Sequence, residues 1–280
     1  MHPRPQEGPR PEISLVPEEG LHCLHSFYRI DRRVSSAFDA ATRAAAKEAF
    51  CEILTPGTDG TPERLQTFVV AGHKADFGFL ALGPDPLALD GIHQRLSASP
   101  LGPALIPAWS FVSLTEVSEY VPTRERYAEM LEAEGLCPKG EEFQQRMAQY
   151  ERRLEIMIRQ RLTPDLPAWP ALCFYPMNKR RQAEANWFLL PFDERERLMG
   201  EHGRSGMEFA GRVTQLVTVG IGLEDWEWGV TLWARNPQFL RDIVYRMRFD
   251  EASARYADFG PFYTAYQQPP GEILAHLRLV

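Results

Sequence analysis

Tyr175 and Lys179 lie four residues apart in the segment ALCFYPMNKR, and their side chains are of types that could do chemistry together. The apolar residues of this segment predict a strand. Side chains on a strand alternate between two faces, so Cys173, Tyr175, Met177 and Lys179 share one wall. A phenol and an ammonium group on that wall could act on one bound ligand. A barrel strand whose tyrosine bonds to backbone and whose lysine reaches water has the same pattern, so both interpretations stay open.

His202 stands among glycines in a segment of otherwise helical composition, PFDERERLMGEHGRSGMEFAG. Gly200, Gly203 and Gly206 bracket it, and each interior glycine costs a helix about 1 kcal/mol relative to alanine. Glycines beside a histidine would let a flat ligand approach the backbone closely, as an axial ligand of haem requires. A lone histidine is also an ordinary surface or core residue, so the segment predicts a ligand only in combination with others.

Two more segments gather polar groups. In RVTQLVTV, Gln215 is the one polar residue on a face with Val213, Val217 and Val219, which is typical of a side chain that faces a cavity or pairs with a neighbouring strand. The segment RMRFDEASARY concentrates charged and hydroxyl side chains after a predicted helix, namely Arg248, Asp250, Glu251, Ser253 and Arg255. It is either part of a site or a charged helix end with capping residues.

These residues belong to a chain in which one order of elements occurs twice. Apolar periodicity and turn residues predict, in the first half, a strand at Leu21–Arg29, a helix at Ser36–Leu54 capped by Ser36, strands from Leu65 and Phe77, a helix at Pro86–Ser97 and a strand at Trp109–Val117. The second half repeats that order with a strand at Ala171–Met177, a helix from Phe192 to about Gly211, strands at Val213–Gly220 and Trp226–Ala234, a helix at Pro237–Met247 and a strand near Phe259–Tyr266. The repeat indicates a weak internal duplication.

The predicted fold class is therefore α+β, with a ferredoxin-like βαββαβ unit occurring in tandem and the two antiparallel sheets wrapped into one dimeric α+β barrel that has a ligand cavity. We expect a disordered proline-rich arm over residues 1–20, an N-terminal ferredoxin-like half over 21–121 and a C-terminal, ligand-binding half over 168–280. Between the halves, 122–167 is expected to be a charged connector with a long helix near Glu141–Arg161 and a mobile portion, RERYAEMLEAEGLCPKGEEF.

Composition narrows the class of ligand. The 280 residues carry a formal net charge of −7, which argues against nucleic acid or an anionic membrane and favours a small molecule. The uncharged stretch Leu96–Thr115 is interrupted by glycine and prolines, and the first residues, MHPRPQEGPRPE, lack the apolar core of a signal peptide. We therefore expect no membrane span and a cytoplasmic location. The cysteines lack metal or disulfide spacing and are expected to be free thiols, namely Cys23, Cys51, Cys137 and Cys173.

Taken together, FYPMNKRR, NWFLLPFDERERLMGEHGRSGMEFAGRV, DWEWGVTLWA and YRMRFDEASARYADFGPFY resemble the chlorite dismutase superfamily, specifically its coproheme decarboxylase branch. The resemblance is dense over about Arg161–Tyr266. In the first half it depends on the order of elements and on SLTEVSEY. It implies a homopentamer of tandem ferredoxin-like barrels, haem bound in the C-terminal half, and a transient contact with a ferrochelatase-type upstream enzyme.

The resemblance also implies residue roles. His202 would be the iron ligand and a carboxylate of FDEASAR, taken as Glu251, would orient it. Tyr175 would form a radical, and Lys179 would assist the second of two decarboxylations. The residues expected to line the pocket or bind the porphyrin are Arg161, Met177, Gln215, Ser253 and Tyr120. True dismutases have an arginine where this chain has Gln215, and a neutral amide cannot stabilise an oxychlorine anion by charge.

The implied reaction converts iron-coproporphyrin III to haem b, as the last step of coproporphyrin-dependent haem synthesis. Each of its two decarboxylations consumes hydrogen peroxide and proceeds through a tyrosyl radical. The alternatives are a chlorite dismutase or haem peroxidase, and a haem-binding carrier or sensor without catalysis. Tyr175 together with Lys179 favours the decarboxylase over the carrier.

Overall fold

In the computed structural model, which describes residues 13–279, the first half of the chain forms an antiparallel sheet in the order β2-β3-β1-β4. Its elements are β1 (His22–Ile30), α1 (Arg32–Ser36), α2 (Ala40–Ile53), β2 (Arg64–Val70), β3 (Phe77–Gly83), α3 (Pro86–Ala98), the 3-10 turn η1 (Gly102–Ala104) and β4 (Leu105–Thr115). The helix expected to be capped by Ser36 begins instead at Ala40, because the Asp39 carboxylate accepts a hydrogen bond from Thr42 N at 2.7 Å.

The second half repeats this strand order as β8-β9-β5-β11. Its elements are β5 (Ala171–Lys179), β6 (Arg181–Gln182), β7 (Ala185–Asn186), the 3-10 turn η2 (Trp187–Leu189), α6 (Phe192–Met207), β8 (Val213–Val219), β9 (Trp228–Ala234), α7 (Pro237–Met247), α8 (Glu251–Tyr256), β10 (Ala257–Phe259) and β11 (Tyr263–Gln267). The predicted strand near Phe259–Tyr266 is thus divided into β10 and β11, which both pair with β5.

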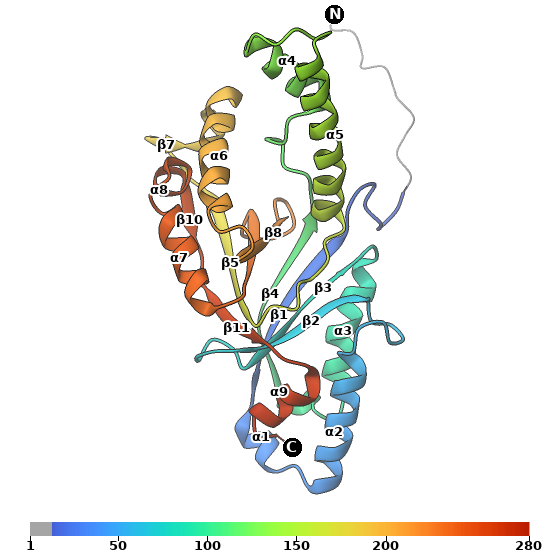
Figure 1. Ribbon diagram of the computed structural model, residues 1–280. Helices are drawn as coiled ribbons and strands as arrows, with labels where there is room; N and C mark the ends of the chain where they lie inside the picture. Colours follow the sequence, from blue (N-terminus) through green and yellow to red (C-terminus); the bar gives the residue numbers. More distant parts are fainter. Residues whose placement is uncertain (1–12, 280) are drawn as a thin grey trace, which may run out of the picture.

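The two halves close into one barrel, and this confirms the predicted fold class. β4 pairs with β8 through Leu114 and Thr115, β11 pairs with β2 through three residues, and β5 pairs with β9 along its length. The strands thus follow one another in a ring, with the helices of each half on its outside (Figure 1).

Three apolar layers stabilise this arrangement. The barrel interior is filled from both halves by aromatic and aliphatic side chains, including Phe27, Phe111, Phe174 and Trp233. A second core lies between the first sheet and α2 and α3, and a third lies between β5, β8, β9 and α7. Along β5, Phe174 faces the interior core and Tyr175 the third core, as the alternation of a strand requires.

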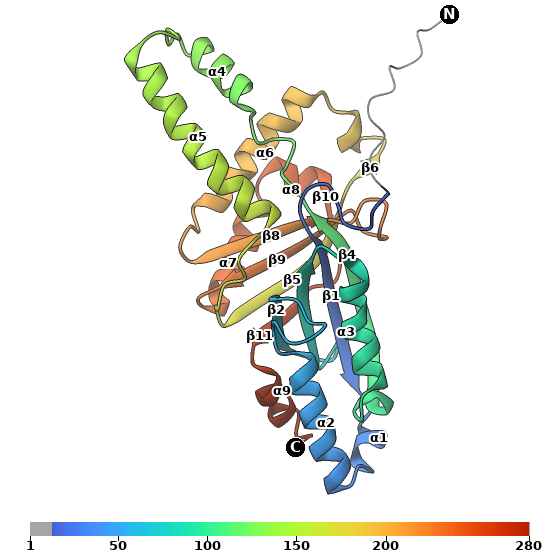
Figure 2. The ribbon, with the colours of Figure 1, turned by 90° about the vertical axis from the view of Figure 1, so that its right-hand side faces the viewer.

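The connector contains two helices, α4 (Arg124–Ala133) and α5 (Glu141–Leu162), which extend together away from the barrel (Figure 2). The portion expected to be a mobile surface segment therefore includes a helix, because Leu131 packs against Phe143 and Met147 of α5. The last helix, α9 (Pro270–His276), lies against the first half. The expected disorder over residues 1–20 falls, for residues 1–12, outside the described part of the chain.

Candidate functional site

A cavity of about 510 Å³ lies between the outer face of β5, β8 and β9 and the helices α6 and α7. Its volume is within the range of about 300–1,000 Å³ that is usual for small-molecule sites. Every residue proposed for the site from sequence, except Glu251, lines this cavity: Tyr120, Arg161, Tyr175, Met177, Lys179, His202, Gln215 and Ser253. The fold therefore brings together residues that are up to 133 positions apart, from Tyr120 to Ser253.

His202, on α6, is oriented by a buried carboxylate. Its Nδ1 lies 3.0 Å from Oδ2 of Asp250, whose side chain is inaccessible to solvent, and 3.4 Å from the Ser253 hydroxyl. Burial is the largest influence on Asp250 and alone would raise its pKa, but the hydrogen bonds from His202 and Ser253 outweigh it and lower that pKa. A carboxylate that accepts from Nδ1–H leaves the Nε2 lone pair free to bind a metal.

Asp250, not Glu251, is thus the partner of His202, and the assignment made from sequence is wrong by one position. Asp250 caps α8 and accepts from Ser253 N at 2.9 Å, so its side chain turns back toward α6. Glu251 is the first residue of α8 and points to the surface, where it lies 3.4 Å from Arg197 and 3.3 Å from Arg255.

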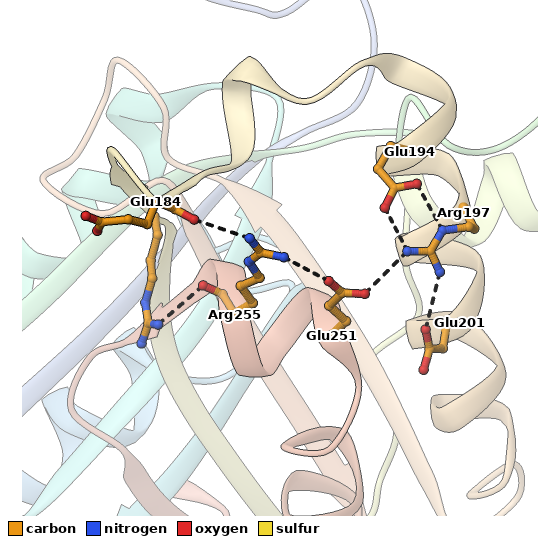
Figure 3. A network of polar contacts seen from close by, with 7 residues as sticks. Glu184, Glu194, Arg197, Glu201, Glu251 and Arg255 are labelled. Carbon is orange, nitrogen blue, oxygen red and sulfur yellow. Dashed lines mark hydrogen bonds and ion pairs between the residues drawn. The ribbon is translucent and has the colours of Figure 1, made fainter.

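Glu251 belongs to a network of charges that joins α6 to α8. Figure 3 shows Arg197 on α6 reaching Glu251 on α8, which reaches Arg255 in turn. Arg197 also lies 2.7 Å from Glu194 and 3.9 Å from Glu201. The helix that carries His202 and the helix that Asp250 caps are therefore connected at the surface as well as through the buried His202–Asp250 contact.

The glycines around His202 do not serve ligand approach. Gly200 and Gly203 do not line the cavity, and a Cβ atom at Gly203 would meet nothing within 4 Å. Only Gly206 has a steric reason, because a Cβ there would lie 3.0 Å from the end of Met247 on α7. The expected role of the flanking glycines is therefore wrong, although His202 itself faces the cavity.

Tyr175 presents an isolated phenol to the cavity. Its side chain is buried, and its ring stacks on Phe262 with centroids 4.4 Å apart. Burial, helped by the nearby Cys173, raises the pKa of Tyr175 well above the ordinary value. At neutral pH the phenol therefore keeps its O–H hydrogen.

Lys179 is the cation at the end of the same wall, and it is 8% exposed. Its Nζ lies 3.8 Å from the centroid of the Trp187 ring and 3.9 Å from Sδ of Met199. Burial lowers the pKa of Lys179 to about 8, and the carboxylates of Asp250 and Glu227 partly oppose this effect. The side chain is therefore still protonated in most molecules at neutral pH.

Three guanidinium groups, of Arg161, Arg195 and Arg248, also line the cavity. Arg195 lies 3.4 Å from Glu119, whereas Arg161 and Arg248 form no ion pair within residues 13–279, and Arg248 lies over the Phe259 ring at 4.0 Å. Burial lowers the pKa of Arg161, and Glu116 partly offsets that effect. Sequence reasoning placed Arg248 in a charged segment without a role, because nothing local distinguishes it from its charged neighbours.

Gln215 interrupts an apolar wall. It extends from β8 beside Val217 and Val219, and Val230 and Val244 complete that side of the cavity. The predicted position of Gln215 as the one polar group on its face of β8 is confirmed. Among the described residues, none of the helices is long and apolar enough to cross a lipid bilayer.

Comparisons with known proteins identify relatives of this chain. The family model described as chlorite dismutase matches residues 43–268. A protein of Natronomonas pharaonis, whose name proposes that it binds heme, is 37% identical over 259 residues; the match covers 91% of this chain and 40% of that protein. The chain thus spans well under half the length of that curated relative.

Solved structures show the same fold. A heme-binding protein from Thermus thermophilus is 33% identical, with a TM-score of 0.74 and coverage of 93% of this chain and 96% of that one. A mutant chlorite dismutase from Candidatus Nitrospira defluvii is 15% identical, with a TM-score of 0.67 and the same coverage. The cavity, the barrel and the matched family model lead to one conclusion: this chain belongs to the chlorite dismutase family.

Proposed function

We propose that this protein binds iron-coproporphyrin III in the cavity and converts it to haem b by two oxidative decarboxylations that consume hydrogen peroxide. The observation that carries the proposal is a set of unpaired cations, Lys179, Arg161 and Arg248, around an otherwise largely apolar cavity in the described part of the chain. Lys179 is buried, Arg161 is partly buried and Arg248 is exposed, and a cation removed from water without a partner is costly unless an anionic ligand neutralises it. Coproporphyrin III has four propionates and haem b has two, so the excess of cations favours the more acidic porphyrin.

The residues present fit an iron porphyrin. His202 would hold the iron through Nε2, since Nδ1 is bound to Asp250, and the valine-rich face of β8 and β9 would contact the flat ring. Ser253 and Tyr120 offer hydroxyl groups at the cavity wall for propionate oxygens. The names of two relatives, which refer to heme binding, support the same class of ligand.

Each decarboxylation is a balanced two-electron oxidation. The propionate loses CO₂, a hydrogen atom from carbon, the carboxyl proton and one electron, and a vinyl group remains. One hydrogen peroxide takes up the two electrons and two protons and becomes two water molecules. The iron of the substrate supplies the redox chemistry.

The chain positions the reacting groups. Tyr175 would give its phenolic proton and one electron to the peroxide-derived oxidant and would then take a hydrogen atom from the propionate, which restores the phenol. Its burial against Phe262 excludes water from this exchange. Lys179 holds the second propionate when the three-propionate intermediate turns toward Tyr175. Gln215 brings no charge to its side of the cavity, so an oxychlorine anion would gain little beside it.

The family resemblance further leads us to propose a homopentamer that receives its substrate from a ferrochelatase-type enzyme. Sedimentation of the purified chain, alone and with that enzyme, tests both points. A monomer in the presence and absence of porphyrin would contradict the first.

The test of function is a titration of the coproheme complex with hydrogen peroxide, followed by mass spectrometry of the porphyrin. The wild type should lose two CO₂ units in sequence. Tyr175→Phe should bind equally well and lose none, whereas Lys179→Met should stop after the first. The matched control Tyr245→Phe, on the outer surface of α7, should behave as the wild type. Haem b formed at a comparable rate by Tyr175→Phe would contradict the radical role. Tight binding of coproheme without any product in the wild type would favour the carrier.

A further inference from the structure

The carboxylates nearest to Lys179 are already engaged with other groups. Glu227 accepts from the backbone N–H of Lys179 at 2.7 Å, and its other oxygen lies 3.5 Å from Arg181. Asp250 accepts from His202 and from the backbone of Ser253. In the part of the chain that the structure describes, the Lys179 ammonium therefore forms no ion pair, although it is almost fully buried.

Trp187 occupies the position that a counter-ion would take. The Lys179 Nζ lies 3.8 Å from the centroid of its ring, and the indole is only 3% exposed. The backbone N–H of Trp187 donates to the carbonyl of Arg180, next to Lys179 in the chain, at 2.9 Å. Tyr120 and Tyr256 contact the ring edge-on, with centroids 6.3 and 5.6 Å away. The ring is thus fixed by its neighbours, and one face remains for the ammonium.

An aromatic face and a carboxylate would hold a lysine with different consequences. A carboxylate would neutralise the ammonium, whereas the ring attracts the cation through its quadrupole and leaves its charge in place. Without either partner, the four-carbon stem of Lys179 would turn the ammonium toward bulk water. Trp187 therefore keeps a full positive charge inside the cavity.

We infer that Trp187 is a positioning residue, whose indole face holds the Lys179 ammonium in the cavity as a receptor for one carboxylate of the porphyrin. This inference rests on the proposed function for the identity of the ligand. It adds a residue that neither the sequence pattern nor the family match had assigned, and it predicts that Trp187 and Lys179 act as one unit.

The contact between the Lys179 ammonium and the Trp187 ring is tested on the ligand-free protein by NMR. The chain has four lysines, so selective ¹³C labelling of lysine gives a small set of CεH₂ signals, from Lys47, Lys74, Lys139 and Lys179. One of them should be displaced upfield by the ring current of Trp187. Lys179→Met should identify that signal by removing it. Trp187→Leu should return it to the position of the others, and Trp187→Phe should leave part of the displacement. A Lys179 signal at an ordinary position in the wild type would overturn the inference.

The receptor role is tested with iron-free coproporphyrin III, whose binding is followed by the absorbance of the porphyrin. Trp187→Leu should weaken binding by about tenfold, as the loss of a desolvated cation–π contact predicts, and so should Lys179→Met. The double variant should bind no more weakly than either single variant, because each change removes the same interaction. Trp187→Phe should recover most of the affinity.

Trp169→Leu is the matched control. It removes another tryptophan that lies under a cation, with Arg235 4.5 Å from the ring centroid, but Trp169 does not line the cavity. It should bind the porphyrin as the wild type does. Additive losses in the double variant, or a Trp187→Leu protein with unchanged affinity, would overturn the receptor role. Failure of the wild type to bind coproporphyrin III would instead contradict the proposed function, while the NMR displacement still decides the role of Trp187.

Discussion

Replacement of Asp250 should separate two contributions that this one side chain makes. Its Oδ1 caps α8 through Ser253 N at 2.9 Å, and its Oδ2 lies 3.0 Å from Nδ1 of His202. Loss of an N-cap costs about 1 kcal/mol. Loss of a buried hydrogen bond to a charged group costs about 1.5–3 kcal/mol. Asp250→Ala should therefore lower the free energy of unfolding by about 3 kcal/mol.

Asp250→Ser and Asp250→Asn distinguish the contribution of the helix cap from that of the contact with His202. Serine caps a helix but is too short to reach His202, so Asp250→Ser should recover about 1 kcal/mol relative to Asp250→Ala. Asparagine can cap the helix and still accept from Nδ1, so Asp250→Asn should lose only the charge, roughly 1 kcal/mol. Urea unfolding of the ligand-free protein measures each value. Asp242→Ser, at a half-buried surface position on α7 where the carboxylate pairs with the exposed Arg241, should stay within about 0.5 kcal/mol of the wild type.

The same series predicts metal affinity. Because Asp250 orients the imidazole, Asp250→Ala and Asp250→Ser should weaken binding of an iron porphyrin by about 10–100-fold, and Asp250→Asn by less. The spectrum of the histidine-bound iron reports this binding. If Asp250→Ser equalled the wild type in both stability and iron binding, the contact with His202 would contribute nothing and the reasoning would be refuted.

Three further results are expected. Chlorite should release negligible oxygen at an oxygen electrode, since Gln215 supplies no cation, and rapid sustained release would contradict this view of the site. Burial lowers the pKa of Lys179 to about 8 from an ordinary 10.5, so between these pH values the unfolded chain binds more protons than the folded chain. The free energy of unfolding of the ligand-free protein, measured relative to Lys179→Met, should therefore rise as the pH rises from 8 to 10.5. A difference between the two proteins that does not change with pH would argue against the lowered pKa. Arg197→Gln removes the ion pair with Glu251 that joins α6 to α8, so it should speed the transfer of bound iron porphyrin to a scavenger protein at low salt. Concentrated salt screens exposed ion pairs, so the variant and the wild type should then transfer porphyrin at the same rate. Arg204→Gln, on the same helix, should transfer porphyrin as the wild type does at both salt concentrations.

The sequence was most informative where a short-range rule decides the outcome. The alternation along β5 placed Tyr175, Met177 and Lys179 on one face, and this needs only the geometry of a strand. The choice between Asp250 and Glu251 failed because it depends on where α8 begins. The capping residue turns inward and the next one outward, so an error of one position exchanges the buried carboxylate for a surface one.

Other parts of the site depend on contacts between distant residues, which no local sequence pattern indicates. Trp187 reaches Lys179 through a hairpin whose strands have two residues each, and short strands leave little periodic signal. Arg248 is one of several arginines after α7, and only the folded barrel shows that it faces the cavity. The helix α4 was missed because its stability comes from Leu131 against α5, while its own composition is strongly polar.

The position of α9 has a consequence for the order in which the protein folds. Its residues Ile273 and Leu274, with Leu277 and Leu279 after it, are buried in the core between the first sheet and α2. During synthesis, the first half must leave the ribosome with this part of its core open, because Ile273, which helps to fill it, follows Ile53 of α2 by 220 positions in the chain. The N-terminal half is therefore incomplete until translation has passed residue 279, and a chain that ends before α9 would expose Phe50 and Ile53 of α2 to chaperones and proteases.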